Sequence, residues 1–199
     1  MIKVGLTGGI GAGKTLVSQI FHLLGVPVYY ADQRAKWLMA NNSSLIVQIK
    51  SIFGDEAYSG SNQLNREYLA SRVFNNADQL EKLNKLVHPT VGEDYQEWLR
   101  QHAESAYTIK EAALIFETQS HQTLDKVILV TAPVKVRVER TLFRDNHRSR
   151  SQVNDIIERQ MQENEKKSLA DIIIDNDGTK LLIPQVMKIN QMLMEESVK

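Results

Sequence analysis

A glycine-rich segment near the start of the sequence carries the residue types best suited to chemistry. Residues 8–15 read Gly-Gly-Ile-Gly-Ala-Gly-Lys-Thr, which fits the pattern G-x-x-x-x-G-K-[ST]. Glycines let the backbone curl until successive N–H groups point at one polyphosphate, and Lys14 would add a full positive charge. The hydroxyl of Thr15 is of the kind that binds the Mg²⁺ ion bridging the outer phosphates. The segment therefore predicts a site for a nucleoside triphosphate and its metal ion.

The residues around this segment predict the strand and the helix that the motif requires. Residues 2–6 form an apolar run, and apolar side chains recur at helical spacing over residues 16–24. The positive end of such a helix stabilises phosphate groups. A glycine-rich turn that merely caps a helix is the alternative, but it does not account for the Lys-Thr pair. The residues expected to contact the nucleotide are Gly8, Gly9, Gly11, Ala12, Gly13, Lys14, Thr15 and Leu16.

Asp32 is a second candidate for a chemical role. It follows a predicted strand at residues 26–30 and precedes a predicted helix at residues 33–39. Open α/β sheets hold their ligands beyond the carboxyl ends of strands, where a carboxylate could orient an attacking hydroxyl group. An aspartate that only caps the following helix is an equally good interpretation from residue type and position, and both roles are compatible.

The remaining elements alternate in a way that predicts an α/β fold. Residues 45–100 carry helical apolar stripes without a convincing strand, so a helical lobe is expected there, with His88-Pro89 breaking one of its helices. Strand signals return at residues 107–116, 126–131 and 170–175. Five strands alternating with helices predict a five-stranded, mostly parallel sheet with flanking helices, of the kind found in P-loop kinases. Taken alone, His88 is expected to be structural.

A predicted helix at residues 134–145 carries three arginines on one face. Arg137, Arg140 and Arg144 are spaced at i, i+3 and i+7, so their charges repel one another unless an anion lies nearby. ATP could supply that anion, and a solvated basic face is the alternative. Arg137 is expected to be a surface residue. Further along, Ser151 is predicted to cap the next helix.

The composition excludes several classes of protein. The chain has 199 residues, 42% of them hydrophobic, which suits one globular domain. Lysine plus arginine and aspartate plus glutamate each number 24, so no net charge attracts nucleic acid or an anionic membrane. The absence of cysteine excludes disulfides and thiol catalysis. With neither a signal-peptide pattern nor an apolar run of about 18 residues, the protein is expected to be cytoplasmic, and no obligate protein partner is evident.

Several motifs, taken in order, resemble the dephospho-coenzyme A kinase family almost from end to end. Residues 6–14 look like the family's P-loop, and Tyr30-Ala31-Asp32 aligns with its D-A-D segment. The later motifs are residues 86–89 (L-x-H-P), 114–117 (from P-L-L-F-E), 140–145 (R-x-x-x-R-D) and 170–178 (A-D-x-x-I-D-N-x-G). Tyr30 replaces the first aspartate of D-A-D, and Ala113 replaces the proline of P-L-L-F-E.

The resemblance implies transfer of the γ-phosphoryl group of ATP, with Mg²⁺, to the ribose 3′-hydroxyl of dephospho-coenzyme A. The products would be coenzyme A and ADP. It also implies one kinase domain over residues 1–199 with three parts. These are a core at residues 1–31, 105–140 and 168–199, a helical acceptor lobe at about residues 32–104, and a lid at about residues 141–167.

The same analogy assigns roles to particular residues. Asp32 would accept the proton of the hydroxyl group, and His88 would join Asp32 in the acceptor site. Arg140 would lie against the adenine, whereas Arg144 would reach the transferring phosphates as a catalytic residue. Glu111 could support the metal ion through water, with a solvent-facing strand residue as the alternative.

Three other functions were weighed against this interpretation. A kinase of another small acceptor, such as a nucleoside monophosphate or shikimate, would share the P-loop, base and lid but have a different pocket. A regulatory GTPase is disfavoured because residues 84–87, Asn-Lys-Leu-Val, lack the aspartate of the guanine-reading N-K-x-D motif. A nucleic-acid-stimulated ATPase is disfavoured by the neutral charge and by the lack of a basic tract interleaved with aromatic residues.

Overall fold

The structure is a computed structural model that describes residues 1–60, 63–74 and 76–198. The chain divides into two compact units. The first, here called the sheet unit, comprises Met1–Tyr30 and His102–Lys199, and the second, the helical unit, comprises Ala31–Gln101. Each unit has a hydrophobic core of its own.

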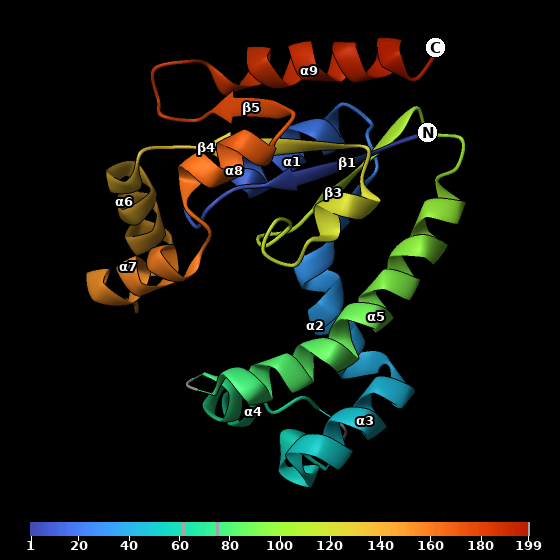
Figure 1. Ribbon diagram of the computed structural model, residues 1–199, viewed down its shortest axis with the longest axis vertical. Helices are drawn as coiled ribbons and strands as arrows, with labels where there is room; N and C mark the ends of the chain where they lie inside the picture. Colours follow the sequence, from blue (N-terminus) through green and yellow to red (C-terminus); the bar gives the residue numbers. More distant parts are fainter. Residues whose placement is uncertain (61–62, 75, 199) are drawn as a thin grey trace. The chain divides into compact units, whose positions relative to one another are not determined.

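The sheet unit is built on five strands in the order β2-β3-β1-β4-β5, and every described pairing is parallel. The strands are β1 (Ile2–Thr7), β2 (Val28–Tyr30), β3 (Tyr107–Glu111), β4 (Lys126–Thr131) and β5 (Ile172–Asp175). The chain passes from β1 toward one edge and later crosses to the other, so the strand order changes direction beside β1 (Figure 1). Sheets of this kind bind ligands at that point, beyond the carboxyl ends of the strands.

Both faces of the sheet are covered, as a parallel sheet requires. Side chains on one face pack against α1 (Lys14–Leu23) and α9 (Leu182–Glu196), which also contact each other. On β4 the side chains alternate: Ile128 and Val130 belong to this core, whereas Val127 belongs to a second cluster. That second cluster also contains Ile115, Phe116, Leu124, Met161 and Ala170.

The third strand is shorter than the sequence predicts. The expected strand at residues 107–116 ends at Glu111, and turns follow it. Its neighbour β1 ends at Thr7, so the ladder has no further partner after the Ala112 N–H donates to the Leu6 carbonyl. The apolar residues Ile115 and Phe116, which were predicted to extend the strand, are instead buried in the second core cluster.

In the described part of the helical unit there are four α-helices and a short 3₁₀ turn. The elements are α2 (Ala31–Asn41), α3 (Ser43–Phe53), η1 (Asp55–Ala57), α4 (Arg66–Val73) and α5 (Ala77–Gln101). Their apolar stripes meet in one core that includes Leu45, Ile49 and Val87. An ion pair between Arg34 and Asp94 joins α2 to α5.

The expectation that His88-Pro89 breaks a helix was wrong. Pro89 lies inside α5, which runs unbroken for 25 residues, and Figure 1 shows this helix bending along its length. A proline inside a helix costs about 3 kcal/mol, but packing of the surrounding residues can offset that cost. Here Val87, Tyr95 and Leu99 are buried on the inner side of α5. Tertiary contacts therefore outweigh the local preference.

The segment between β4 and β5 contains three helices in place of the two that the sequence predicts. They are α6 (Val134–Arg144), α7 (Arg150–Arg159) and α8 (Glu163–Leu169). The cap of α7 is Ser149 and not Ser151 as predicted. The Ser149 hydroxyl accepts from the Gln152 N–H at 3.2 Å, and the Gln152 side chain accepts from the Ser149 N–H at 2.9 Å. This reciprocal capping box fixes the start of the helix two residues earlier than expected.

Within the three described ranges, no helix is both long enough and apolar enough to span a membrane.

Candidate active site

The predicted P-loop connects β1 to α1, as the sequence indicates. Gly11 and Gly13 have φ values of 75° and 101°, a left-handed backbone that favours glycine. Gly8 is required for a different reason: a Cβ atom there would lie 2.4 Å from the Val130 carbonyl oxygen on β4. The loop is thus curled and packed closely against the sheet, which is the arrangement that turns backbone N–H groups toward an anion.

Lys14 and Thr15 occupy the first turn of α1. The Lys14 ammonium group donates to the Gly8 carbonyl at 2.9 Å, so the side chain folds back along the loop. Thr15 is exposed at the same turn, where the partial positive charge of the helix is greatest. An ammonium group, a hydroxyl group and a helix N-terminus are therefore gathered at one end of the loop.

Arg137 is buried, and its expected position on the surface was wrong. Only 4% of the residue is exposed. Its Nε atom donates to the Ile10 carbonyl at 3.0 Å, and its Nη1 atom lies 3.0 Å from Glu163 Oε2. A Cβ atom on Gly9 would come within 2.1 Å of Arg137 Nη2. The first arginine of α6 thus packs onto the P-loop.

Arg140 reaches the other side of the P-loop through a residue that the sequence analysis missed. Its Nη1 atom donates to the Asn176 carbonyl at 2.8 Å. The Asn176 side chain in turn donates from Nδ2 to the Ala12 carbonyl at 2.8 Å. The available signal was the A-D-x-x-I-D-N-x-G segment, because Asn176 directly follows the last strand and so lies at the carboxyl edge of the sheet.

Arg144 is largely exposed and is paired with the neighbouring Asp145. Its guanidinium group donates two bonds of 3.0 Å to Asp145, whose carboxylate also lies 3.4 Å from Arg148 Nε. The hydrogen bond to the Asp145 carboxylate raises the pKa of Arg144, and the same bond lowers the pKa of Asp145. The charges of the three arginines are thus offset by carbonyl and carboxylate groups of the chain itself.

In the sequence, one acidic residue ends the strand β3 and another follows the strand β2. Glu111 is the last residue of β3 and only 8% exposed, so the alternative of a solvent-facing strand residue was wrong. Its register partners are Leu6 on β1 and Tyr30 on β2. Asp32 belongs to the helical unit, follows β2 by two residues in sequence, and is exposed as the second residue of α2. It lies inside the helix and is not its cap.

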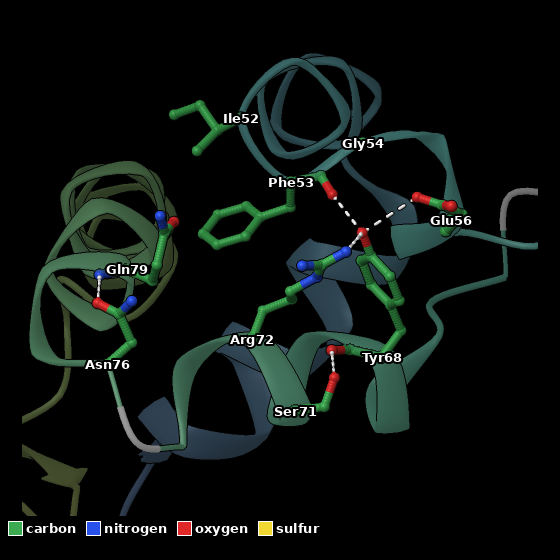
Figure 2. Close-up of a pocket in the computed structure, with 9 residues that line it drawn as sticks. All are labelled: Ile52, Phe53, Gly54, Glu56, Tyr68, Ser71, Arg72, Asn76 and Gln79. Atoms are coloured by element: carbon green, nitrogen blue, oxygen red, sulfur yellow. Dashed lines mark hydrogen bonds between the residues drawn. The ribbon is translucent and has the colours of Figure 1, made fainter.

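The helical unit contains His88 and a separate pocket. His88 is exposed on α5. The pocket, of about 630 Å³, is lined by residues at the end of α3, on η1 and α4, and at the start of α5. Figure 2 shows the Arg72 guanidinium group between Phe53 and Tyr68, with its Nη2 atom 3.1 Å from the Tyr68 hydroxyl. The pocket combines apolar, cationic and amide side chains.

The sheet order and the loop geometry define the class of the protein. A parallel sheet whose central strand runs into a curled glycine loop and a Lys-Thr helix start is the architecture of P-loop kinases. A family model described as dephospho-CoA kinase matches residues 2–181. The chain belongs to the dephospho-CoA kinase family.

Individual relatives and solved structures are similar to the chain over most of its length. A dephospho-CoA kinase of Bacteroides fragilis is 36% identical over 196 residues, covering 98% of this chain and 94% of the relative. The crystal structure of TT1252 from Thermus thermophilus has a TM-score of 0.83 at 31% identity, covering 98% and 97% of the two chains. A dephospho-CoA kinase from Campylobacter jejuni, at 23% identity, has the same fold with a TM-score of 0.73 over 98% of both chains.

Proposed function

We propose that the P-loop of the sheet unit binds ATP with Mg²⁺ and that its γ-phosphoryl group is transferred to the ribose 3′-hydroxyl of dephospho-coenzyme A. This is the activity of the family to which the chain belongs. The observation that carries the proposal is the curled loop at residues 8–15, with the Lys14 ammonium group against the Gly8 carbonyl. Phosphoryl transfer needs mainly alignment and neutralised charge, which such a loop provides.

The P-loop residues would divide the work of holding the phosphates. The N–H groups of Gly11, Gly13 and Leu16 would donate to phosphate oxygens, and the Lys14 ammonium group would exchange the Gly8 carbonyl for an oxygen of the outer phosphates. Because the loop is already curled, little ordering is needed on binding, which preserves binding energy for the transition state.

The residues at the start of α1 suit a magnesium ion. Mg²⁺ in kinases keeps several waters and binds through nucleotide phosphates together with one or two protein oxygens. Thr15 offers an exposed hydroxyl oxygen of this kind. The described residues hold no group of three or more acidic or histidine ligands, and a nucleotide-bound Mg²⁺ does not need one. When bound, the ion would neutralise charge on the β- and γ-phosphates.

Asp32 is the residue we assign to the acceptor hydroxyl. As a general base it would accept the proton of the 3′-hydroxyl group while the oxygen attacks the phosphorus atom. Asp32 is an exposed residue at the start of α2, two residues after β2 in the sequence. Tyr30 stands where the family has another aspartate, so Asp32 alone would carry this role in the segment.

We assign the binding of ATP to Arg140 and the transfer of the phosphoryl group to Arg144, with about residues 141–167 as the lid. We expect Arg144→Ala to lower kcat by about tenfold with a smaller rise in KM for ATP, because its contact would strengthen as charge shifts in the transition state. Arg140→Ala should mainly raise KM for ATP, since it also frees Asn176, which holds the loop at Ala12. Steady-state kinetics at varied ATP separate the two effects. Normal turnover of both variants at low ATP would refute the lid assignment.

The acceptor site is assigned to the helical unit. The pocket of Figure 2 would suit the pantetheine arm, which carries amides and an apolar branch, because amide, cationic and apolar side chains line it. We expect Arg72→Ala and His88→Ala to raise KM for dephospho-coenzyme A by about three- to tenfold and to leave KM for ATP unchanged. Arg66→Ala, a change to an exposed arginine on α4 outside the pocket, is the matched control. Unchanged acceptor KM in Arg72→Ala would place the arm elsewhere, and unchanged acceptor KM in His88→Ala would remove His88 from the acceptor site.

The proposed reaction is tested by ADP formation. With ATP, Mg²⁺ and dephospho-coenzyme A, we expect one ADP for each coenzyme A formed, and we expect EDTA to abolish both. ADP formation that is independent of the acceptor would indicate an ATPase instead. A location in the cytoplasm stays a prediction from the sequence.

A further inference from the structure

Both backbone polar groups of Ile10, in the middle of the P-loop, are bound by side chains from outside the loop. The carbonyl accepts from Arg137 Nε at 3.0 Å, and the N–H donates to Gln160 Oε1 at 3.0 Å. The two side chains approach each other, with Arg137 Nη2 and Gln160 Oε1 at 3.5 Å. Arg137 lies on α6, and Gln160 caps the end of α7. One peptide segment of the loop is therefore clamped between two helices.

The clamp continues into the next helix. Arg137 Nη1 lies 3.0 Å from Oε2 of Glu163, the first residue of α8. A buried guanidinium group is stable only when its donors are paired, and here a carboxylate, a backbone carbonyl and an amide oxygen surround it. The arginine thus joins the P-loop to the connection between α7 and α8. It is held in place by its charge as well as by packing.

Glycine at position 9 makes room for this arrangement. A Cβ atom there would lie 2.1 Å from Arg137 Nη2 and 2.4 Å from Cζ. The backbone of Gly9 is not in the left-handed region, and the three atoms nearest to a Cβ at this position all belong to Arg137. The need for glycine at position 9 therefore comes from the clamp and not from the turn.

We propose that Arg137 and Gln160 are positioning residues that fix Ile10 and so set the shape of the P-loop for ATP. The inference rests on the proposed function, since it takes the P-loop to be the ATP site. Because the Ile10 N–H already donates to Gln160, it does not donate to the phosphates. The amides that follow in the loop would bind them instead. The clamp makes the spacing of those amides depend on α6 and on the connection between α7 and α8.

Gln160→Met tests the clamp, because it removes the acceptor while keeping the length of the side chain. We expect kcat/KM for ATP to fall about tenfold, with the loss mainly in KM for ATP and with KM for dephospho-coenzyme A unchanged. Hydrogen exchange at the Ile10 amide should become faster in the free protein. Gln160→Glu keeps an acceptor oxygen and should retain most of the activity. Gln191→Met, at an exposed glutamine on α9, is the matched control and should behave as the wild type.

Gly9→Ala tests the same clamp from the other side. The new methyl group should displace the Arg137 guanidinium group and raise KM for ATP by a similar factor. Because both changes break one network, the double variant Gly9→Ala/Gln160→Met should lose less than the product of the two single effects. Wild-type kinetics and unchanged exchange at Ile10 in Gln160→Met, or full additivity in the double variant, would overturn the clamp. If the wild type itself neither bound ATP nor transferred phosphate, the proposed function would fail instead.

Discussion

Asp32→Asn is expected to lower kcat by a factor on the order of 10² to 10⁴ while leaving the fold and most of the substrate binding intact. Asparagine has the same shape as aspartate but cannot accept the proton of the attacking hydroxyl group. The exposed position of Asp32 in the first turn of α2 means that little packing is lost. Stopped-assay kinetics, with calorimetry of ATP and acceptor binding, give both quantities.

Asp78→Asn is the matched control for this variant. Asp78 is also an exposed aspartate, preceded by alanine and placed second in its helix, α5. Both substitutions therefore remove the same favourable interaction with a helix N-terminus, and only one of them removes the proposed base. Two results would reverse the assignment: equal kcat losses in the two variants, or a loss of binding of both substrates in Asp32→Asn. A kcat loss of the same size in His88→Ala, with stability and acceptor binding unchanged, would make His88 the better candidate.

Lys14→Ala is expected to lower kcat by a factor on the order of 10² to 10³. The substitution removes the ammonium group whose full positive charge would stabilise the γ-phosphoryl group in the transition state. The side chain runs along the P-loop surface to the Gly8 carbonyl and is not part of the hydrophobic core, so the melting temperature should change little. Rapid-quench kinetics of the first turnover measure the loss in the chemical step. Lys188→Ala, at an exposed lysine on α9, should keep wild-type rates. Near-normal transfer by Lys14→Ala would show that the P-loop is not the site of phosphate chemistry.

Much of the sheet could be predicted because its signals are local. The strand at residues 126–131 matches β4, and the P-loop lies between a strand and a helix as its motif requires. A glycine pattern fixes backbone conformation directly, and a parallel strand buried on both faces is apolar along its whole length. Neither inference depends on residues far away in the sequence.

The errors arose where distant contacts decide the outcome. Residues 115 and 116 are apolar like the residues of a buried strand, but the neighbouring strand β1 has already ended at Thr7. Pro89 disfavours a helix locally, yet packing within the helical unit holds α5 together. A buried residue is apolar whether it lies in a turn or in a strand, so only the tertiary structure distinguishes the two cases.

In the candidate site, too, local signals could be read from the sequence and distant contacts could not. Residues 8–15 were identifiable from type and spacing alone, whereas Arg137 was misjudged, because its partners Ile10 and Glu163 lie on other elements. Helical spacing correctly places the three arginines on one face, but it cannot say which of them packs against the P-loop. Asn176 was missed for the same reason, since its link to Ala12 spans most of the chain.

The position of the new phosphate on the product is the decisive measurement for the proposed reaction. The chain is incubated with ATP, Mg²⁺ and dephospho-coenzyme A, and phosphorus NMR locates the phosphomonoester on the isolated product. We expect a single phosphate on the ribose 3′-oxygen, formed together with an equal amount of ADP and absent in the Asp32→Asn variant on the same timescale. Phosphate at another position, or transfer to shikimate or a nucleoside monophosphate but not to dephospho-coenzyme A, would contradict it.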